Sequence, residues 1–172
     1  MNVCKKCQSD NVNIFLDNEI LKYKGAEIPY QLAYSVCQNC EREFISTAQI
    51  KANDCRVREA KKVHDDLMSA VEIKQAREQL SLTQEQASQV FGGGRNAFSK
   101  YERSEVAQSV AMDKLIRVAL SNSDAYQFLL EQEGIQIGTG YYNNVIKFPQ
   151  KESDTDRLRS TNEFDVYEKD YG

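Results

Sequence analysis

The chain has 172 residues, of which 41% are hydrophobic and 28% charged, an ordinary composition for a globular protein. No apolar run approaches the roughly 18 to 20 residues of a membrane helix, and the first residues hold no apolar signal segment. We therefore expect a cytoplasmic protein with no membrane partner. The net charge of −4 argues against nucleic-acid binding, but residues 121–172 carry ten acidic and only five basic side chains. The preceding part of the chain can therefore present a local basic face to DNA.

Four of the five cysteines form two Cys-x-x-Cys pairs, Cys4 with Cys7 and Cys37 with Cys40. Two intervening residues allow both sulfurs of a pair to bind one ion at about 2.3 Å. Four thiolates complete a tetrahedron without an open position, which is typical of a structural Zn²⁺ rather than a catalytic one. A pair of reduced turns without metal is the alternative. A redox motif is disfavoured because neither pair opens a helix in a βαβ unit.

The residues between the two cysteine pairs have the pattern of β-strands. Apolar runs occupy residues 12–16, 20–24 and 28–36, with a turn signal at Asp17-Asn18 and a glycine at position 25. The pattern predicts a three-stranded zinc ribbon over residues 1–46. Such a small unit buries too little surface to fold alone, so the metal is expected to supply the missing free energy.

Residues 47–68 are polar with apolar positions at helical spacing, which predicts a linker helix. Its basic cluster is interpreted as a solvated helix face, with phosphate contacts as the alternative; it comprises Arg56, Arg58, Lys61 and Lys62. Cys55 and His64 lack an evident chemical partner and are interpreted as a small helix residue and an exposed side chain.

Residues 69–133 predict an all-α domain of five short helices, over residues 69–80, 83–91, 95–103, 110–120 and 123–132. A turn of three glycines at 92–94 separates the second helix of this domain from the third, which is the helix-turn-helix arrangement. Ser88 is small enough for the two helices to cross closely, and Gly92 permits a positive φ in the turn. A phosphate-binding loop is disfavoured because neither a preceding strand nor a Lys-Ser/Thr pair accompanies the glycines.

The third helix of this domain is the candidate recognition helix for the DNA major groove. Asn96 can pair with the N6 and N7 atoms of adenine, and Lys100 can donate to guanine O6 or N7 one turn later. Arg95 can reach a base or a phosphate, and Thr83 and Gln84 are candidates for phosphate contacts. A plain helix-terminal polar residue is the alternative interpretation of Asn96.

The order of these segments resembles the MqsA-type antitoxins, over roughly residues 1–130. The string Phe-Gly-Gly-Gly-Arg-Asn-Ala-Phe-Ser-Lys-Tyr-Glu at 91–102 carries much of the resemblance. It implies a cognate toxin, usually an mRNA-cleaving ribonuclease, bound through the zinc domain. It also implies a homodimer formed by the helix-turn-helix domain, repression through a palindromic operator, and base contacts by Asn96 and Lys100.

This sequence departs from the family pattern near the recognition helix. Lys100 stands where the basic residue is commonly Arg, so the planar fork that suits guanine is missing. Arg95 replaces a residue that is often apolar and can compensate. The segment 103–109 lacks the Pro and Gly of many members, which leaves its loop geometry open.

Residues 134–172 are predicted to be a flexible, acidic tail, with docking of 141–148 on a partner as the alternative. Taken together, the sequence predicts an α+β protein and not an enzyme, because no nucleophile–base pair or carboxylate pair is evident. The rival functions are a stand-alone transcription regulator without a toxin, and a zinc-ribbon enzyme or RNA-binding factor.

Overall fold

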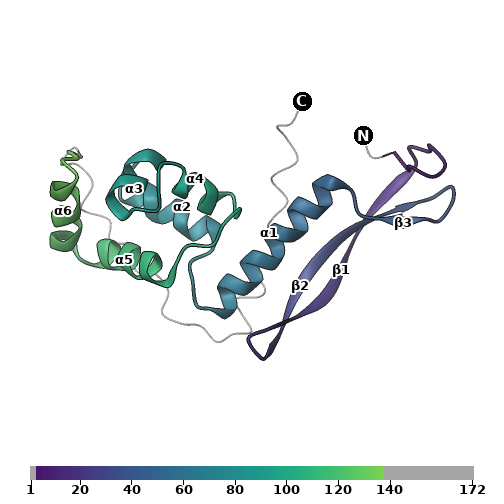
Figure 1. Cartoon of the computed structure of the whole chain (residues 1–172), viewed down its shortest axis with the longest axis horizontal. Coiled ribbons are helices and arrows are strands. Elements are labelled where there is room, and N and C mark those ends of the chain that lie inside the picture. The colour runs from purple at the N-terminus through teal and green to yellow at the C-terminus, as the bar shows by residue number, and fades with distance from the viewer. Residues whose placement is uncertain (1–2, 138–172) are drawn as a thin grey trace. The chain divides into compact units, whose positions relative to one another are not determined.

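The computed structural model describes residues 3–137, and the predicted tail from residue 138 onward, including 141–148, lies outside them. The elements in chain order are β1 (Val12–Tyr23), β2 (Ala26–Cys37), β3 (Glu43–Phe44), α1 (Thr47–His64), α2 (Ala70–Gln79), α3 (Gln84–Phe91), α4 (Ala97–Glu102), α5 (Val110–Ser121) and α6 (Ser123–Gln132) (Figure 1). A three-stranded antiparallel sheet thus precedes a helical domain of five helices, α2 to α6, which confirms the predicted α+β fold class. Within the described part, no helix is long and apolar enough to cross a membrane.

Strands β1 and β2 form one long hairpin that runs from the pair Val12–Cys37 to the pair Tyr23–Ala26. The two-residue turn consists of Lys24 and Gly25, with φ angles of 49° and 83°. Positive φ at both central residues is the requirement of the tight hairpin turn whose twist matches the strands.

The predicted turn at Asp17-Asn18 is wrong, because both residues are paired within the continuous β1–β2 ladder. The local turn preference of Asp and Asn is overridden once the turn at Lys24 fixes the register of the whole hairpin. The third strand is consequently the short β3, which pairs with Ser35 and Val36 rather than with the first strand.

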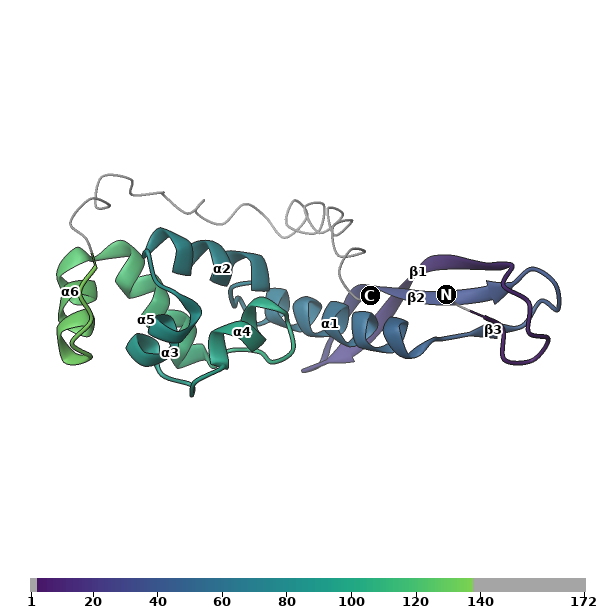
Figure 2. The ribbon, with the colours of Figure 1, turned by 90° about the horizontal axis from the view of Figure 1, so that it is seen from above.

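Helix α1 begins with a reciprocal cap in which Ser46 accepts from the Gln49 amide and the Gln49 side chain accepts from the Ser46 amide. The helix then packs on β2 through buried amides. The Asn53 side chain accepts from the Ala33 amide at 2.8 Å and donates to the Ala33 carbonyl at 2.9 Å. It thereby satisfies main-chain groups of β2 in the way a neighbouring strand would. Figure 2 shows α1 running beside this strand.

The interpretation of the basic cluster in α1 as a solvated face is wrong. Lys62 is only 1% exposed and forms an ion pair with Glu59 at 2.9 Å. Arg58 donates to the carbonyl of Ser104, in the loop after α4. Lys61 lies over the Tyr23 ring. These cations are used in intramolecular contacts, so α1 is a packed element as well as a connection. His64 is exposed, as expected, and its ring meets that of Tyr23 edge-on.

The helical domain has its own hydrophobic core, formed by residues from Met68 to Leu130. Ser69 and Thr83 cap α2 and α3, each in a reciprocal arrangement with the glutamate or glutamine three residues later. Phe98 of α4 and Ile116 of α5 are each 1% exposed in the centre of this core. This core therefore packs α3 and α4 against the other helices of the domain.

Helices α1, α2 and α4 share one kind of ending. Each is followed by a residue in the left-handed conformation, namely Asp66 (φ 57°), Ser81 (φ 55°) and Ser104 (φ 53°). In each case the next amide bonds back to a carbonyl of the last helical turn. Glycine is the usual residue at such positions, because a Cβ atom makes the left-handed conformation costly.

Candidate metal centre and candidate nucleic-acid interface

The structure brings the four predicted metal ligands together. The sulfurs of Cys4 and Cys40 are 3.6 Å apart, and those of Cys7 and Cys37 are 3.5 Å apart. All four lie within 4.8 Å of one another. Metal–sulfur bonds of about 2.3 Å in a tetrahedron imply sulfur–sulfur distances of about 3.8 Å, whereas a disulfide bond measures about 2.05 Å. The cluster has the size of a metal site and not of two disulfides.

The two cysteine pairs use the same backbone turn. The amide of Gln8 bonds to the carbonyl of Cys4, and the amide of Glu41 bonds to the carbonyl of Cys37, both at 2.8 Å. Gln8 and Glu41 are both left-handed, with φ angles of 62° and 56°. The repeated turn aims both sulfurs of each pair at one point. The bond from the Gln38 amide to the Asn11 carbonyl joins the second turn to the segment that follows the first.

Backbone hydrogen bonds, burial and neighbouring sulfurs shift the pKa values of Cys4 and Cys40 in opposite directions. Hydrogen bonds from the backbone amides of Cys7 and Lys6 lower the pKa of Cys4 to about 6. The Arg42 amide acts in the same direction on Cys40, but burial and the three neighbouring sulfurs outweigh it and raise the pKa of Cys40 to about 12. The Cys40 thiol would therefore need a cation that shares its charge in order to ionise at neutral pH. These donors fit a thiophilic metal ion.

The turn between α3 and α4 depends on its glycines and on Ser88. A Cβ atom at Gly93 would lie 2.9 Å from the Cβ of Ala97, so the close approach of the turn to α4 requires glycine there. The Ser88 hydroxyl donates to the Gln84 carbonyl at 2.9 Å and accepts from the Phe98 amide at 3.4 Å. Gly92 has a φ of 85°, as the sequence predicted. These contacts hold α3 and α4 together across a glycine turn, which is the order of elements in a helix-turn-helix.

The predicted base-reading residues lie on the surface around the start of α4. Arg95, Asn96 and Lys100 are all exposed. Asn96 is the N-cap residue of α4, but its side chain makes no capping hydrogen bond. The side-chain amide of Asn96 is therefore not used to cap the start of α4. Arg95 lies 3.7 Å from Glu85 in an ion pair whose side chains are 84% and 65% exposed, a contact too solvated to hold the guanidinium firmly.

The two residues predicted to contact phosphates differ in their surroundings. The Thr83 hydroxyl caps α3 by accepting from the Gln86 amide at 3.2 Å. The Gln84 side chain donates to Glu102, at the end of α4, at 2.8 Å. Glu102 in turn forms an ion pair with Arg77 at 2.5 Å, with side chains 5% and 12% exposed. The hydrogen bond that Arg77 donates to Glu102 raises the pKa of Arg77.

The ion pair of Arg77 and Glu102 was missed by sequence analysis. The two residues are 25 positions apart and belong to helices α2 and α4. Neither helical periodicity nor a capping motif links residues at this separation. The pair orients Gln84 and ties the end of α4 to the core of the domain, so it shapes the surface that the exposed residues form.

The chain thus combines a β-hairpin module that carries a four-cysteine cluster with a helical domain in which a glycine turn separates α3 from α4. A family model described as the antitoxin component of a bacterial toxin-antitoxin system, MqsA, matches residues 2–126. The chain therefore belongs to the MqsA antitoxin family. Antitoxin MqsA of Escherichia coli (strain K12) is 35% identical to it over 83 residues, which are 48% of this chain and 63% of that protein. The similarity thus spans less than two thirds of that relative's length.

Proposed function

We propose that this chain is the antitoxin of a toxin-antitoxin pair and that it acts through two arms. The ribbon binds and neutralises a ribonuclease-type toxin, and the helix-turn-helix domain binds a palindromic operator as a homodimer and represses its own operon. The observation that carries the proposal is the match to the antitoxin family over both parts, from residue 2 to residue 126.

The metal in this proposal is one structural Zn²⁺, held by Cys4, Cys7, Cys37 and Cys40. Four sulfur donors at near-tetrahedral distances support this choice, because Zn²⁺ takes that geometry without redox chemistry. The bound ion would join the start of the chain to the end of β2 and so fix the base of the hairpin.

The toxin-binding arm is proposed to use strand β1. Among residues 3–137, β1 pairs only with β2, so its outer edge carries free main-chain donors and acceptors. One face of β1 carries three exposed apolar side chains, because every second residue of a strand points to the same side. They are Ile14, Leu16 and Ile20, which are 53%, 52% and 64% exposed. An apolar stripe beside a free strand edge suits a partner that adds a strand and buries these side chains.

The DNA-binding arm is proposed to use α4 in the major groove. The exposed amide of Asn96 would pair with adenine, and Lys100 would donate to guanine. A two-fold dimer would place two such helices about 34 Å apart, in successive major grooves. Val118 of α5 and Phe128 of α6 are 46% and 59% exposed, and we propose that a second copy of the chain covers them.

Co-expression with the protein encoded by the adjacent gene tests the proposal. We expect the neighbour alone to stop growth, and to be harmless and co-purify when this chain is present. The variant Leu16→Glu should abolish co-purification, whereas Val71→Glu, at an apolar position of α2 that is 45% exposed against 52% for Leu16, should not. A harmless neighbour that does not bind would instead favour a stand-alone transcription regulator.

A further inference from the structure

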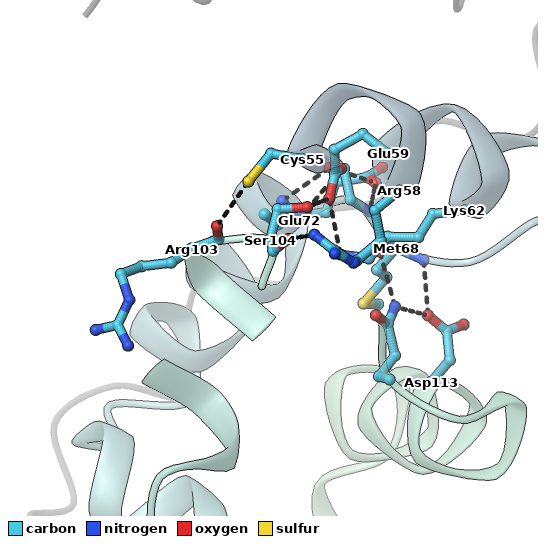
Figure 3. A network of polar contacts seen from close by, with 12 residues as sticks. Cys55, Arg58, Glu59, Lys62, Met68, Glu72, Arg103, Ser104 and Asp113 are labelled. Carbon is cyan, nitrogen blue, oxygen red and sulfur yellow. Dashed lines mark hydrogen bonds and ion pairs between the residues drawn. The ribbon is translucent and has the colours of Figure 1, made fainter. Parts of the chain in front are cut away.

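Helix α1 holds the residue that ends α4, although α1 lies outside the helical domain in sequence. Ser104, directly after the C-cap of α4, is 5% exposed and has a left-handed φ of 53°. Its carbonyl accepts a hydrogen bond from the guanidinium of Arg58, and its hydroxyl donates to the carboxylate of Glu59. Cys55, one turn earlier in α1, donates to the carbonyl of Arg103 at 3.7 Å. Figure 3 shows these side chains of α1 converging on the loop after α4.

The carboxylate of Glu59 joins three segments of the chain. Besides Ser104, it accepts from the amide of Ala70, the first residue of α2, at 3.1 Å. It also lies 2.9 Å from the ammonium group of Lys62, whose side chain is 1% exposed. A charge buried to this extent is strongly disfavoured without its counter-ion, so the ion pair with Lys62 holds the Glu59 carboxylate in place.

The same helix is tied to the ribbon through other residues. Asn53 bonds to both main-chain groups of Ala33, and Gln49 bonds to the hydroxyl of Ser35 at 3.0 Å. All four of these residues are at most 7% exposed. A single helix therefore connects β2 to the end of α4. Its hydrogen bonds to β2 are buried, so water does not readily replace them. The bonds of Arg58 and Glu59 to Ser104 are partly buried.

We propose that Arg58 and Glu59 are positioning residues for α4: they fix the end of the helix relative to the ribbon and so set how its exposed residues enter a DNA groove. This inference rests on the proposed function, because it concerns DNA recognition by α4. Neither residue needs to touch DNA. They act through Ser104, whose left-handed conformation closes the last turn of α4.

The test uses the full-length, metal-loaded chain with the double substitution Arg58→Met and Ser104→Gly. Methionine keeps an unbranched stem but cannot donate, and glycine adopts the left-handed conformation without a Cβ atom. The matched control is Ser81→Gly, which changes the corresponding left-handed residue after α2 (φ 55°). Backbone ¹⁵N relaxation gives separate rotational correlation times for the ribbon and for the helical domain.

We expect a common correlation time for both parts in the wild type and in Ser81→Gly, and two different values in the double variant. The ratio of affinities for a duplex from upstream of its own gene and for a scrambled duplex should fall about 2- to 30-fold in the double variant only. Thermal unfolding of the helical domain should change equally little in both variants. A uniform loss of affinity for both duplexes would contradict positioning.

An unchanged correlation time in the double variant would overturn the inference, and so would changed tumbling with unchanged discrimination. If the wild type itself did not discriminate between the duplexes, the proposed DNA function would fail. Separate tumbling of ribbon and helical domain in the wild type would overturn the inference as well, whether or not the chain binds DNA. The two failures are therefore distinguishable.

Discussion

The ribbon and the helical domain obtain their stability in different ways. Eight consecutive residues of the twelve in β1, from Asn13 to Ile20, are exposed. The buried residues of the sheet lie mainly in β2 and at the cysteines. The helical domain instead buries a continuous core from α2 to α6. A hairpin with one open strand leaves apolar surface for a partner but lacks a core of its own, so it depends on four cysteines and on α1.

Removal of the metal should have the largest effect and should act on the ribbon alone. Cys37→Ala eliminates one buried ligand, and binding of structural zinc contributes on the order of 10 kcal/mol to the folding of comparable units. We expect lost zinc in the purified protein and fast amide exchange across β1 and β2, with unchanged protection of α2 to α6. The control Cys55→Ala should retain one ion per chain.

The converse experiment truncates the core of the helical domain. Phe98 is 1% exposed and packs against Phe91 and Tyr101, so Phe98→Ala should cost about 3–5 kcal/mol in unfolding free energy. Denaturant unfolding followed by helical circular dichroism would measure this loss, while zinc content should be unaffected. A simultaneous loss of zinc would mean that the two parts fold as one cooperative unit.

Sequence patterns were sufficient where chemistry is local. The cysteine pairs were recognisable because a metal requires two ligands from one tight turn, and the helix-turn-helix was recognisable from Ser88 and the glycines at 92–94. In both cases residues close in sequence determine the geometry. The same locality made the wrong turn at Asp17-Asn18 plausible, since hairpin register depends on residues on the opposite strand.

Contacts between residues far apart in the chain could not be predicted from the sequence. A polar α1 with regular charges has the pattern of a solvated helix. Lys62 is nevertheless buried beside Glu59, whose carboxylate also bonds to Ser104, 45 positions further along the chain. The loop after α4 lacks glycine, and the structure accounts for its geometry by placing Ser104 in the left-handed conformation. That conformation is held by partners that no local pattern indicates.

A smaller effect, confined to DNA recognition, is expected at the surface of the helical domain. Asn96→Ala should cost about 1–3 kcal/mol of specific binding and relax the preference for adenine at one operator position. Gln84→Ala should instead weaken binding to all duplexes alike, because its proposed contact is a phosphate. Fluorescence anisotropy with operator and scrambled duplexes measures both. Equal losses on both duplexes for Asn96→Ala would contradict the assignment of α4 as the recognition helix.

The smallest effect is expected where the tip of the hairpin meets α1. Hydrogen bonds from Lys24 at 2.7 and 2.8 Å and from Tyr23 at 2.8 Å lower the pKa of Asp65. A carboxyl group with a depressed pKa in the folded state stabilises that state above its unfolded pKa of about 3.9, and the contribution disappears as the pH falls through the folded pKa. Asp65→Asn should therefore destabilise the hairpin slightly at neutral pH and make no difference in strong acid.

The pH dependence of this contact can be separated from that of the metal site. Metal release in acid affects the wild type and Asp65→Asn alike, because protons compete for the same thiolates in both. The difference between the two proteins therefore isolates the carboxylate, and hydrogen exchange at Tyr23 and Ala26 reports it at the hairpin tip. The Lys24 side chain is 58% exposed, so added salt should reduce the difference further. A difference that persisted unchanged into strong acid would show that Asp65 acts through packing rather than through its charge.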